Sequence, residues 1–399
     1  MDILSELGLA PVLNGVGPAT RLGGLPLPDE VWDAVRMATR SNVRMDELQI
    51  ACGRRIARLL GVPGAYVTSG ATAALTLAAA AVMTRAQPAL IDQLPHVESM
   101  PFEVVIQRAH RDPYDHAVTS VGARLVEIGF PATTHPDELE RVLSERTAAV
   151  LFRPGRPGNL LSLRQTAEVA HRHDVPVIVD GALYVPPVDR LTAFFDDGAD
   201  LVAVSGGKGF RGPQASGLLC GRPDLLDAVA LHHQDMDERQ TTWPSLPRAG
   251  RPSRGATPPR HGIGRGMKVG REQLFGLLAA IERYLRDPAA DERCGIAELD
   301  LVESGLITEP RLVVTRVDDD ALAVPTLHID VSGADRGVDE IVRRLAAGSP
   351  RAFVGEELAW RNVLTVNPMA LAQGHGTALA TAIRDAVADS PPSSPTAHE

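Results

Sequence analysis

The sequence predicts an α/β protein with a large domain, built on a mostly parallel sheet with one antiparallel strand, and a smaller C-terminal α/β domain. Three observations predict this fold. Short apolar runs, such as 177–179 and 201–204, are separated by a helix-sized segment. An amphipathic stretch at 269–286 has the length of a helix that links two domains. The chain has 399 residues, of which 44% are hydrophobic, so it can fill a large core.

Composition argues against several classes of protein. The formal net charge of −10 is unlike that of a general binder of nucleic acids or anionic membranes. The three cysteines are widely spaced and form neither a disulfide framework nor a metal-binding pair. The first residues lack the features of a signal peptide, and no uncharged apolar run reaches membrane-spanning length. We therefore expect a protein of the reducing cytoplasm with a small-molecule substrate, and neither a nucleic acid nor a membrane as partner.

We predict four segments along the chain. Residues 11–24 combine glycine and proline with little periodicity, as in an irregular arm. From Asp29 to Leu60 apolar residues recur at helical spacing, and the last dozen residues are rich in serine and proline. The predicted segments are an N-terminal arm at 1–28, a large domain at 29–268, a linker helix with a small domain at 269–388, and a disordered tail at 389–399.

A turn of small residues follows the first predicted strand, at 65–68. It consists of Ser69, Gly70 and Ala71, and it opens an alanine-rich segment that we expect to be a buried helix. Small residues let backbone N–H groups approach an anion, and a helix start adds partial positive charge. The turn is a candidate phosphate seat, although such turns are also common as plain helix caps.

A polar cluster separates the strands predicted at 104–107 and 124–128. It contains His110 and Tyr114 in the run His-Arg-Asp-Pro-Tyr. A flat imidazole at a strand end can stack on an aromatic cofactor. The alternative interpretation is a polar loop without further function.

Asp180 and Lys208 each follow a buried apolar strand. Asp180 ends the run at 177–179, and Lys208 comes after Ser205 and two glycines at the end of the run at 201–204. One helix-sized segment lies between the two runs, which makes a βαβ unit, so both residues are expected at the carboxyl ends of parallel strands. Open α/β sheets bind their ligands at that edge.

Lysine is rare in this chain, with Lys208 and Lys268 as the only two among 40 basic residues. An amine can lose its proton and attack a carbonyl carbon, whereas a guanidinium cannot. The bias towards arginine also fits a GC-rich genome, and Lys208 could be an ordinary turn residue. We favour amine chemistry because such a bias would be expected to remove unneeded lysines first.

The segment after Lys208 is expected to return along the sheet. The strand at 216–221 follows too closely for a helical crossover, so it must run antiparallel. Residues 232–266 are rich in proline, arginine and glycine and predict a long loop. In the small domain we predict strands at 311–317, 326–331 and 363–366, and helices at 338–347 and 377–387.

An anion-binding turn, a strand-end aspartate and a lysine flanked by glycines suit pyridoxal 5′-phosphate. The lysine would form the Schiff base, the aspartate would keep the pyridine nitrogen protonated, and the turn would bind the phosphate. The chain resembles the selenocysteine-synthase-like group of fold-type-I pyridoxal-phosphate enzymes, which is similar to class V aminotransferases and includes D-glucosaminate-6-phosphate ammonia-lyase-like proteins. The segments that carry the resemblance are 68–73, 110–114, 177–180, 205–214 and 262–270.

The resemblance implies a role for each site residue and a homo-oligomer of two or more subunits. Lys208 is then the Schiff-base lysine, Asp180 the partner of the pyridine nitrogen, and His110 the residue that stacks on the ring. We expect no metal site, because the cysteines form no metal-binding pattern and the paired histidines are poorly placed as ligands. The phosphate would be bound by Ser69, Gly70, Ala71, Ser205 and, from a partner subunit, Lys268, and the substrate by Arg21, Tyr114 and Arg265.

The leading functional hypothesis is a lyase that works at the α-carbon of an amino acid or amino-sugar acid and eliminates ammonia or a β-substituent. Lys208 would be the general base, and His110, Tyr114 or Tyr184 would supply an acid for the leaving group. The alternatives are an aminotransferase, a racemase or an aldolase of the same fold. Selenium transfer on tRNA is less favoured, because the chain is acidic and leaves no room for an N-terminal tRNA-binding domain. A regulatory cofactor-binding protein is a further alternative.

Overall fold

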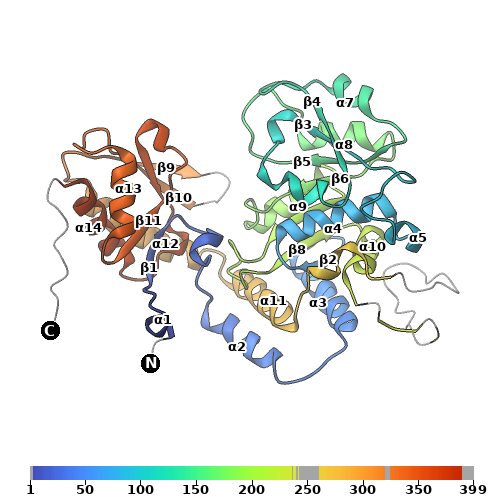
Figure 1. Ribbon diagram of the computed structural model, residues 1–399, viewed down its shortest axis with the longest axis horizontal. Coiled ribbons are helices and arrows are strands. Elements are labelled where there is room, and N and C mark those ends of the chain that lie inside the picture. Colours follow the sequence, from blue (N-terminus) through green and yellow to red (C-terminus); the bar gives the residue numbers. More distant parts are fainter. Residues whose placement is uncertain (1–2, 236, 240, 242–259, 320–323, 389–399) are drawn as a thin grey trace. The chain divides into compact units, whose positions relative to one another are not determined.

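The computed structural model describes the chain except for residues 1–2, 236, 240, 242–259, 320–323 and 389–399 (Figure 1). It divides into two compact units, Leu27–Leu285 and Met1–Pro26 with Arg286–Glu399. Residues 1–26, expected within the arm, thus group with the C-terminal part of the chain. The linker helix α11 (Arg271–Arg286) belongs to the larger unit up to Leu285. The predicted tail at 389–399 lies outside the described residues.

The larger unit contains a seven-stranded sheet that is parallel except for one strand. Strand β8 (Gly217–Gly221) runs antiparallel to both of its neighbours, as predicted from the short connection that precedes it. The strands in sheet order are β2 (Ala65–Thr68), β8, β7 (Leu201–Ser205), β6 (Val177–Asp180), β5 (Thr147–Phe152), β3 (Glu103–Gln107) and β4 (Arg124–Ile128). The predicted sheet is confirmed.

Side chains alternate between the two faces of this sheet, and both faces are buried. In β6, Val177 and Val179 join one hydrophobic cluster, whereas Ile178 joins the other. Helices α3 (Met45–Leu60) and α8 (Leu163–His171) contribute to the first cluster. Helices α4 (Ala71–Thr84) and α10 (Pro223–His233) contribute to the second. Because both faces are covered, polar groups can reach a ligand only at the ends of the strands.

Helix α4 is the most deeply buried helix of this layer, as the alanine-rich sequence predicts. Every residue from Ala73 to Thr84 is buried, because the helix packs against the sheet on one side and α10 on another. Alanine side chains are short, so sheet and helices can approach closely. The other helices of the unit are α2 (Asp29–Ala38), α5 (Pro88–Ile91), α6 (His116–Thr119), α7 (Pro136–Val142) and α9 (Val188–Asp196), with 3₁₀ turns η2 (Arg108–His110), η3 (Pro113–Asp115) and η4 (Ile263–Gly266).

Two local predictions in this unit need correction. The helical pattern from Asp29 to Leu60 forms two helices, α2 and α3, because polar residues of modest helix propensity, Thr39 to Asn42, separate them. The loop predicted from His232 begins later, because α10 continues through His233. Much of that loop, residues 242–259, lies outside the described residues.

The smaller unit is a separate α/β assembly. Its three-stranded sheet has the order β12 (Val363–Val366), β10 (Val324–Asp330) and β9 (Val313–Asp319), all antiparallel. Its main helices are α12 (Ala290–Leu306), α13 (Val338–Ala347) and α14 (His375–Val387), whose apolar residues share one core with this sheet. Short elements complete it: α1 (Ile3–Glu6), η1 (Thr20–Leu22), η5 (Ala359–Arg361) and η6 (Pro368–Ala370).

The arm predicted as irregular contains a strand. Strand β1 (Val12–Gly15) pairs in parallel with β11 (Arg351–Val354). The side chain of Leu13 enters the core of the smaller unit, which gives this segment a reason to be ordered. In the described part of the chain, no helix is long and apolar enough to cross a membrane.

His232 shows how strongly α10 and α4 bury polar groups. Its Nε2 atom lies 2.8 Å from the Thr84 hydroxyl oxygen, and its Nδ1 atom has no hydrogen-bond partner among the described residues. Burial lowers the pKa of this imidazole from 6.5 to about 4. The unfolded chain therefore binds a proton between these two pH values that the folded chain excludes. The contribution of neutral, buried His232 to the free energy of unfolding is complete above pH 6.5, and it is lost as the pH falls towards 4.

We predict that His232→Leu makes the protein less sensitive to acid. The free energy of unfolding, measured by urea denaturation between pH 4 and 6.5, should fall less steeply than in the wild type. The slope should decrease by up to about 1.4 kcal/mol per pH unit, which is one proton. His116→Leu is the matched control, because His116 is exposed and should leave the slope unchanged. Equal slopes for wild type and His232→Leu would contradict the prediction.

Candidate active site

The carboxyl ends of four parallel strands bring the predicted site residues to one edge of the sheet. The turn at 69–71 follows β2, and His110 follows β3. Asp180 is the last residue of β6, and Ser205 is the last residue of β7, three positions before Lys208. The register places Ser205 and Thr68 opposite the same residue of β8, Gly217. The predicted phosphate turn and the predicted lysine turn are thus separated by one strand.

The turn that carries Lys208 is tightly packed, which explains its glycines. A Cβ atom on Gly207 would lie 2.9 Å from the Cα atom of Gln214, and one on Gly209 would lie 2.5 Å from the Cδ atom of Pro186. Neither position has room for a side chain. The backbone on both sides of Lys208 is therefore held close to its neighbours, and the direction of the lysine stem is restricted.

The amine of Lys208 has an environment suited to a nucleophile. The side chain is half-buried, and among the described residues its amine makes no hydrogen bond or ion pair. Burial lowers the pKa of Lys208 below its ordinary value of 10.5, and the negative charge of Asp180 opposes part of this shift. A lowered pKa increases the fraction of neutral amine near pH 7, which is the form that attacks a carbonyl carbon.

The turn before α4 can accept an anion. Gly70 has a φ of +122°, which favours glycine, and α4 has no side-chain cap at its start. A Cβ atom on Gly217 would lie 2.5 Å from the carbonyl carbon of Gly70, so strand β8 approaches this turn closely. The first amides of an α-helix have no acceptor within the helix. Such amides, together with the partial positive charge of the helix start, are what a phosphate seat requires.

Asp180 lies in a network of buried charges that the sequence did not reveal. Its Oδ2 atom accepts a bond from Arg153 Nε at 3.2 Å, and its Oδ1 atom lies 3.3 Å from the Ala182 amide nitrogen. Arg153 directly follows β5 and is 3% exposed. Sequence reasoning missed this residue, although an arginine at the end of an apolar run was a usable signal.

His110 lies under the site as a neutral imidazole. The residue is 2% exposed, its ring packs edge-on against Phe152, and its Nδ1 atom lies 3.3 Å from the Arg153 amide nitrogen. Burial, with smaller effects of Arg156 and Arg153, lowers the pKa of His110 to about 4. The ring is therefore uncharged at pH 7, which suits stacking or a hydrogen bond better than the role of a cationic acid.

The two tyrosines considered as acids differ in exposure. Tyr114, in η3, is 57% exposed, and its amide is bonded to Asp112 Oδ1 at 2.7 Å. Tyr184 is half-buried, and its ring occupies the space beside Gly155 that a side chain there would need. Tyr184 is therefore the less exposed of the two, and it lies four residues after Asp180 in the chain.

Lys268 and Arg265 lie at a different pocket of the larger unit. This pocket has a volume of about 430 Å³, and its lining includes both residues together with Tyr66 and His233. Neither Asp180 nor Lys208 lines it. Arg265 forms an ion pair with Asp235 at 2.5 Å, and Lys268 is exposed. A role of either residue at the Lys208 site remains a prediction.

Arg21 belongs to the smaller unit, where it lies 3.9 Å from Glu356 and 6.0 Å from the centre of the Phe353 ring. Its side chain is half exposed. Its predicted contact with substrate is not tested by these contacts.

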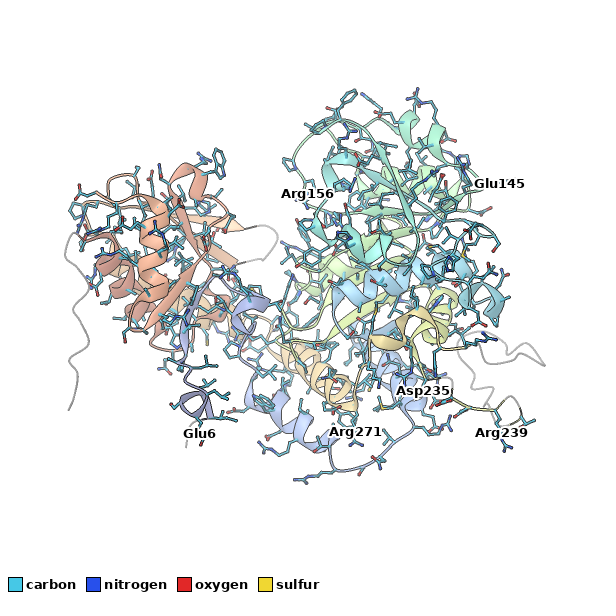
Figure 2. All side chains as sticks on the ribbon, in the orientation of Figure 1. Glu6, Glu145, Arg156, Asp235, Arg239 and Arg271 are labelled. Carbon is cyan, nitrogen blue, oxygen red and sulfur yellow. The ribbon has the colours of Figure 1, made fainter. Side chains whose placement is uncertain are left out.

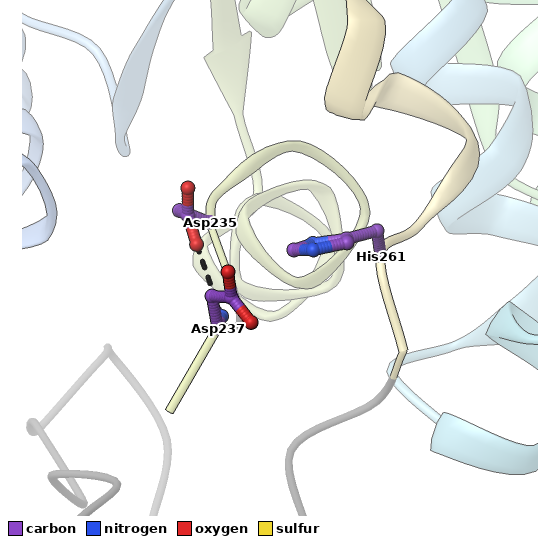
Figure 3. A group of neighbouring side chains, drawn as sticks. All are labelled: Asp235, Asp237 and His261. Carbon is purple, nitrogen blue, oxygen red and sulfur yellow. Dashed lines mark hydrogen bonds between the residues drawn. The ribbon is translucent and has the colours of Figure 1, made fainter. Parts of the chain in front are cut away.

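The structure also brings together three exposed side chains that the sequence did not single out. Ligand atoms of Asp235, Asp237 and His261 all lie within 4.8 Å of one another, and the amide of Asp237 donates to Asp235 (Figure 3). Such a group could hold a metal ion. However, the guanidinium of Arg265 already pairs with Asp235 and compensates its charge. We base no metal site on this cluster.

Known proteins match this chain over most of its length. A family model described as aminotransferase class-V matches residues 33–250. D-glucosaminate-6-phosphate ammonia lyase of Salmonella typhimurium is 27% identical over 396 residues, which cover 96% of this chain and 97% of that protein. A solved structure of D-glucosaminate-6-phosphate ammonia-lyase, 26% identical, superimposes with a TM-score of 0.79 and covers 97% of this chain and 98% of its own.

Two further relatives carry other activities in their names. A 5′-C-glycyluridine monooxygenase-decarboxylase of a Streptomyces species is 28% identical over 379 residues, covering 92% of this chain and 87% of that protein. An L-seryl-tRNA(Sec) selenium transferase of Alkaliphilus oremlandii is 26% identical over 258 residues, covering 56% and 51%. Together with the sheet topology, these matches confirm the predicted fold type I and the predicted resemblance.

We predict that Gly209→Ala destabilises the protein, because the added Cβ atom would lie 2.5 Å from Pro186. Overpacking of this kind destabilises by about 1–3 kcal/mol. Gly266→Ala is the matched control, since a Cβ atom at that exposed position has nothing within 4 Å. Urea denaturation measures both. Equal stability of Gly209→Ala and the wild type would mean that the lysine turn is not constrained as described.

Proposed function

Because the chain belongs to the class V aminotransferase family, we propose that it is a pyridoxal-phosphate enzyme, and specifically a lyase that acts at the α-carbon of an amino acid or amino-sugar acid. The observation that carries the proposal is the amine of Lys208, which has no partner among the described residues and lies at the same strand edge as Asp180 and the uncapped start of α4. Elimination is favoured over other reactions because the similarity to the ammonia lyase extends over nearly the whole of both chains.

The residues at this edge fit pyridoxal phosphate. The bound cofactor would supply an aldehyde for the amine, an electron-accepting ring and a phosphate. Lys208 would hold the aldehyde carbon covalently, and Asp180 would hold a proton on the ring nitrogen. The amides of the turn at 69–71 would bind the phosphate, with the Ser205 hydroxyl as a further donor. The lack of a side-chain cap on α4 and of a partner for Lys208, among the described residues, supports this fit.

Proton transfer would be the main task of the protein's own side chains. The Lys208 amine would remove the proton from the α-carbon, because its lowered pKa favours the neutral form that acts as a base. Elimination also requires an acid for the leaving group. The half-buried hydroxyl of Tyr184 or that of Tyr114 would donate this proton, because His110 is uncharged at pH 7.

Oxidative decarboxylation is the second candidate, because the Streptomyces relative covers nearly as much of the chain as the ammonia lyase. Transamination, racemisation and aldol cleavage share the first bond cleavage at the α-carbon. Selenium transfer is less favoured, since the match to the transferase covers 56% of this chain. The proposal also includes a homodimer or larger assembly in the cytoplasm, in which Lys268 of one subunit serves its neighbour, and substrate contacts by Arg21 and Arg265.

We predict that Lys208→Ala abolishes covalent attachment of pyridoxal phosphate. Purified wild type should be yellow, and borohydride should fix the cofactor to the peptide that contains Lys208, as measured by mass spectrometry. Lys268→Ala is the matched control, because Lys268 is the one other lysine of the sequence and should leave attachment at Lys208 intact. A reducible chromophore in Lys208→Ala would refute the assignment.

The reaction class is tested by the fate of the amino group. Wild-type protein is screened against amino acids and amino-sugar acids, including D-glucosaminate 6-phosphate, for release of ammonia and a 2-oxo acid. We expect many turnovers of ammonia release without an added amino acceptor or oxygen. One turnover per site that leaves pyridoxamine phosphate would show an aminotransferase, and turnover that requires oxygen and releases carbon dioxide would show the oxidative decarboxylation.

A further inference from the structure

Arg153 is the centre of the most buried charge cluster at the candidate site. Its side chain is 4% exposed, yet three carboxylates surround its guanidinium. The oxygen atoms lie 3.2 Å away in Asp112, 2.7 Å in Asp115 and 3.2 Å in Asp180. The guanidinium also donates to the carbonyl oxygen of His110 at 2.6 Å. A planar group with five N–H donors is suited to serve several acceptors at once, which an ammonium group does less well.

The cluster is balanced in charge. Arg111 pairs with Asp115, and Arg156, labelled in Figure 2, lies 3.4 Å from Asp112. Three arginines therefore face three aspartates. Asp112 and Asp115 each have a second arginine, whereas in the described part of the chain Asp180 is paired with Arg153 alone. Loss of Arg153 would leave Asp180 as the aspartate without a guanidinium.

Arg153 forms its hydrogen bond with one of the two carboxylate oxygens of Asp180 and leaves the other oxygen to other donors. The Nε atom of Arg153 donates to Oδ2, and the other oxygen, Oδ1, has the Ala182 amide at the longer distance of 3.3 Å. Carboxylate oxygens can accept more than one hydrogen bond, so Oδ1 keeps capacity for another donor. A hydrogen bond from a guanidinium is stronger than one from a neutral donor, so this contact fixes the orientation of the Asp180 carboxylate.

We propose that Arg153 is a positioning residue that acts through Asp180. Its guanidinium orients the carboxylate, so that Oδ1 is available to hold the proton on the ring nitrogen of the cofactor. This inference rests on the proposed function. The competing explanation is structural, since Arg153 also joins β5 to the segment 110–115, and loss of that contact could disturb the site without any role for Asp180.

A double-mutant cycle separates the two explanations. The variants are Arg153→Gln, Arg153→Lys, Asp180→Asn and the double variant Arg153→Gln/Asp180→Asn, all loaded with pyridoxal phosphate. Arg124→Gln is the matched control, because Arg124 also pairs with a buried carboxylate, Glu103, at the opposite end of the sheet's strands. The measurements are the visible absorption spectrum of the bound cofactor without substrate, kcat and KM, with circular dichroism to confirm folding.

We expect Arg153→Gln and Asp180→Asn to alter the visible spectrum in the same way. Each should lower kcat by about 10- to 100-fold, as is typical when the partner that orients a functional side chain is removed. The change in KM should be smaller. The double variant should lose no more than Asp180→Asn alone, because Arg153 would have nothing left to position. The spectrum of Arg153→Lys should be closer to that of the wild type than the spectrum of Arg153→Gln is. The spectrum of Arg124→Gln should be the same as that of the wild type.

Additive losses in the double variant, or a wild-type spectrum and kcat in Arg153→Gln, would overturn the role of Arg153. If Arg153→Gln does not fold, the cycle is run with Arg153→Lys, and the criterion is then that Arg153→Lys/Asp180→Asn loses no more than Asp180→Asn alone, whereas additive losses overturn the role of Arg153. A wild-type protein that binds no pyridoxal phosphate would instead contradict the proposed function, so the two failures can be told apart.

Discussion

The common direction of β2, β3, β5, β6 and β7 is the constraint on which the candidate site depends. Parallel strands need crossover connections, and the helices in those connections cover both faces of the sheet. The strands of the larger unit are therefore apolar on both sides, as Val177, Ile178 and Val179 show. A charged residue in such a strand is tolerated at its end. Asp180, Arg153 and Lys208 are all found there, from three different strands, and this is why residues far apart in the sequence meet.

Strand ends, strand direction and helix bounds could be predicted from the sequence, because each depends on residues that are close together in the chain. An apolar run that stops at a polar residue marks a strand end, which located Asp180 and Lys208. The length of a connection limits its geometry, which gave the direction of β8. Helix α13 at Val338–Ala347 was predicted from spacing alone, and the structure has it with the same bounds.

Features that depend on distant partners could not be predicted in this way. The pairing of β1 with β11 joins Val12 to Arg351, and nothing in either segment names the other. The apolar run before Arg153 locates that residue at a strand end, but its pairing with three aspartates on other elements leaves no local signal. The grouping of Asp235 with His261 has the same origin. Each of these contacts is set by tertiary packing rather than by a local pattern.

Strand β8 sets a length scale for whatever the site binds. It lies between β2, which leads into the turn at Gly70, and β7, which leads to Lys208. Neighbouring strands are about 4.8 Å apart, so the two strand ends are separated by about 10 Å. Gly217, where β8 begins, packs closely against the backbone of Gly70, so β8 itself separates the two turns. A single small anion could occupy the turn but not reach the other side. This separation suits an elongated molecule with an anionic group at one end and an electrophile near the tip of the long lysine stem at the other.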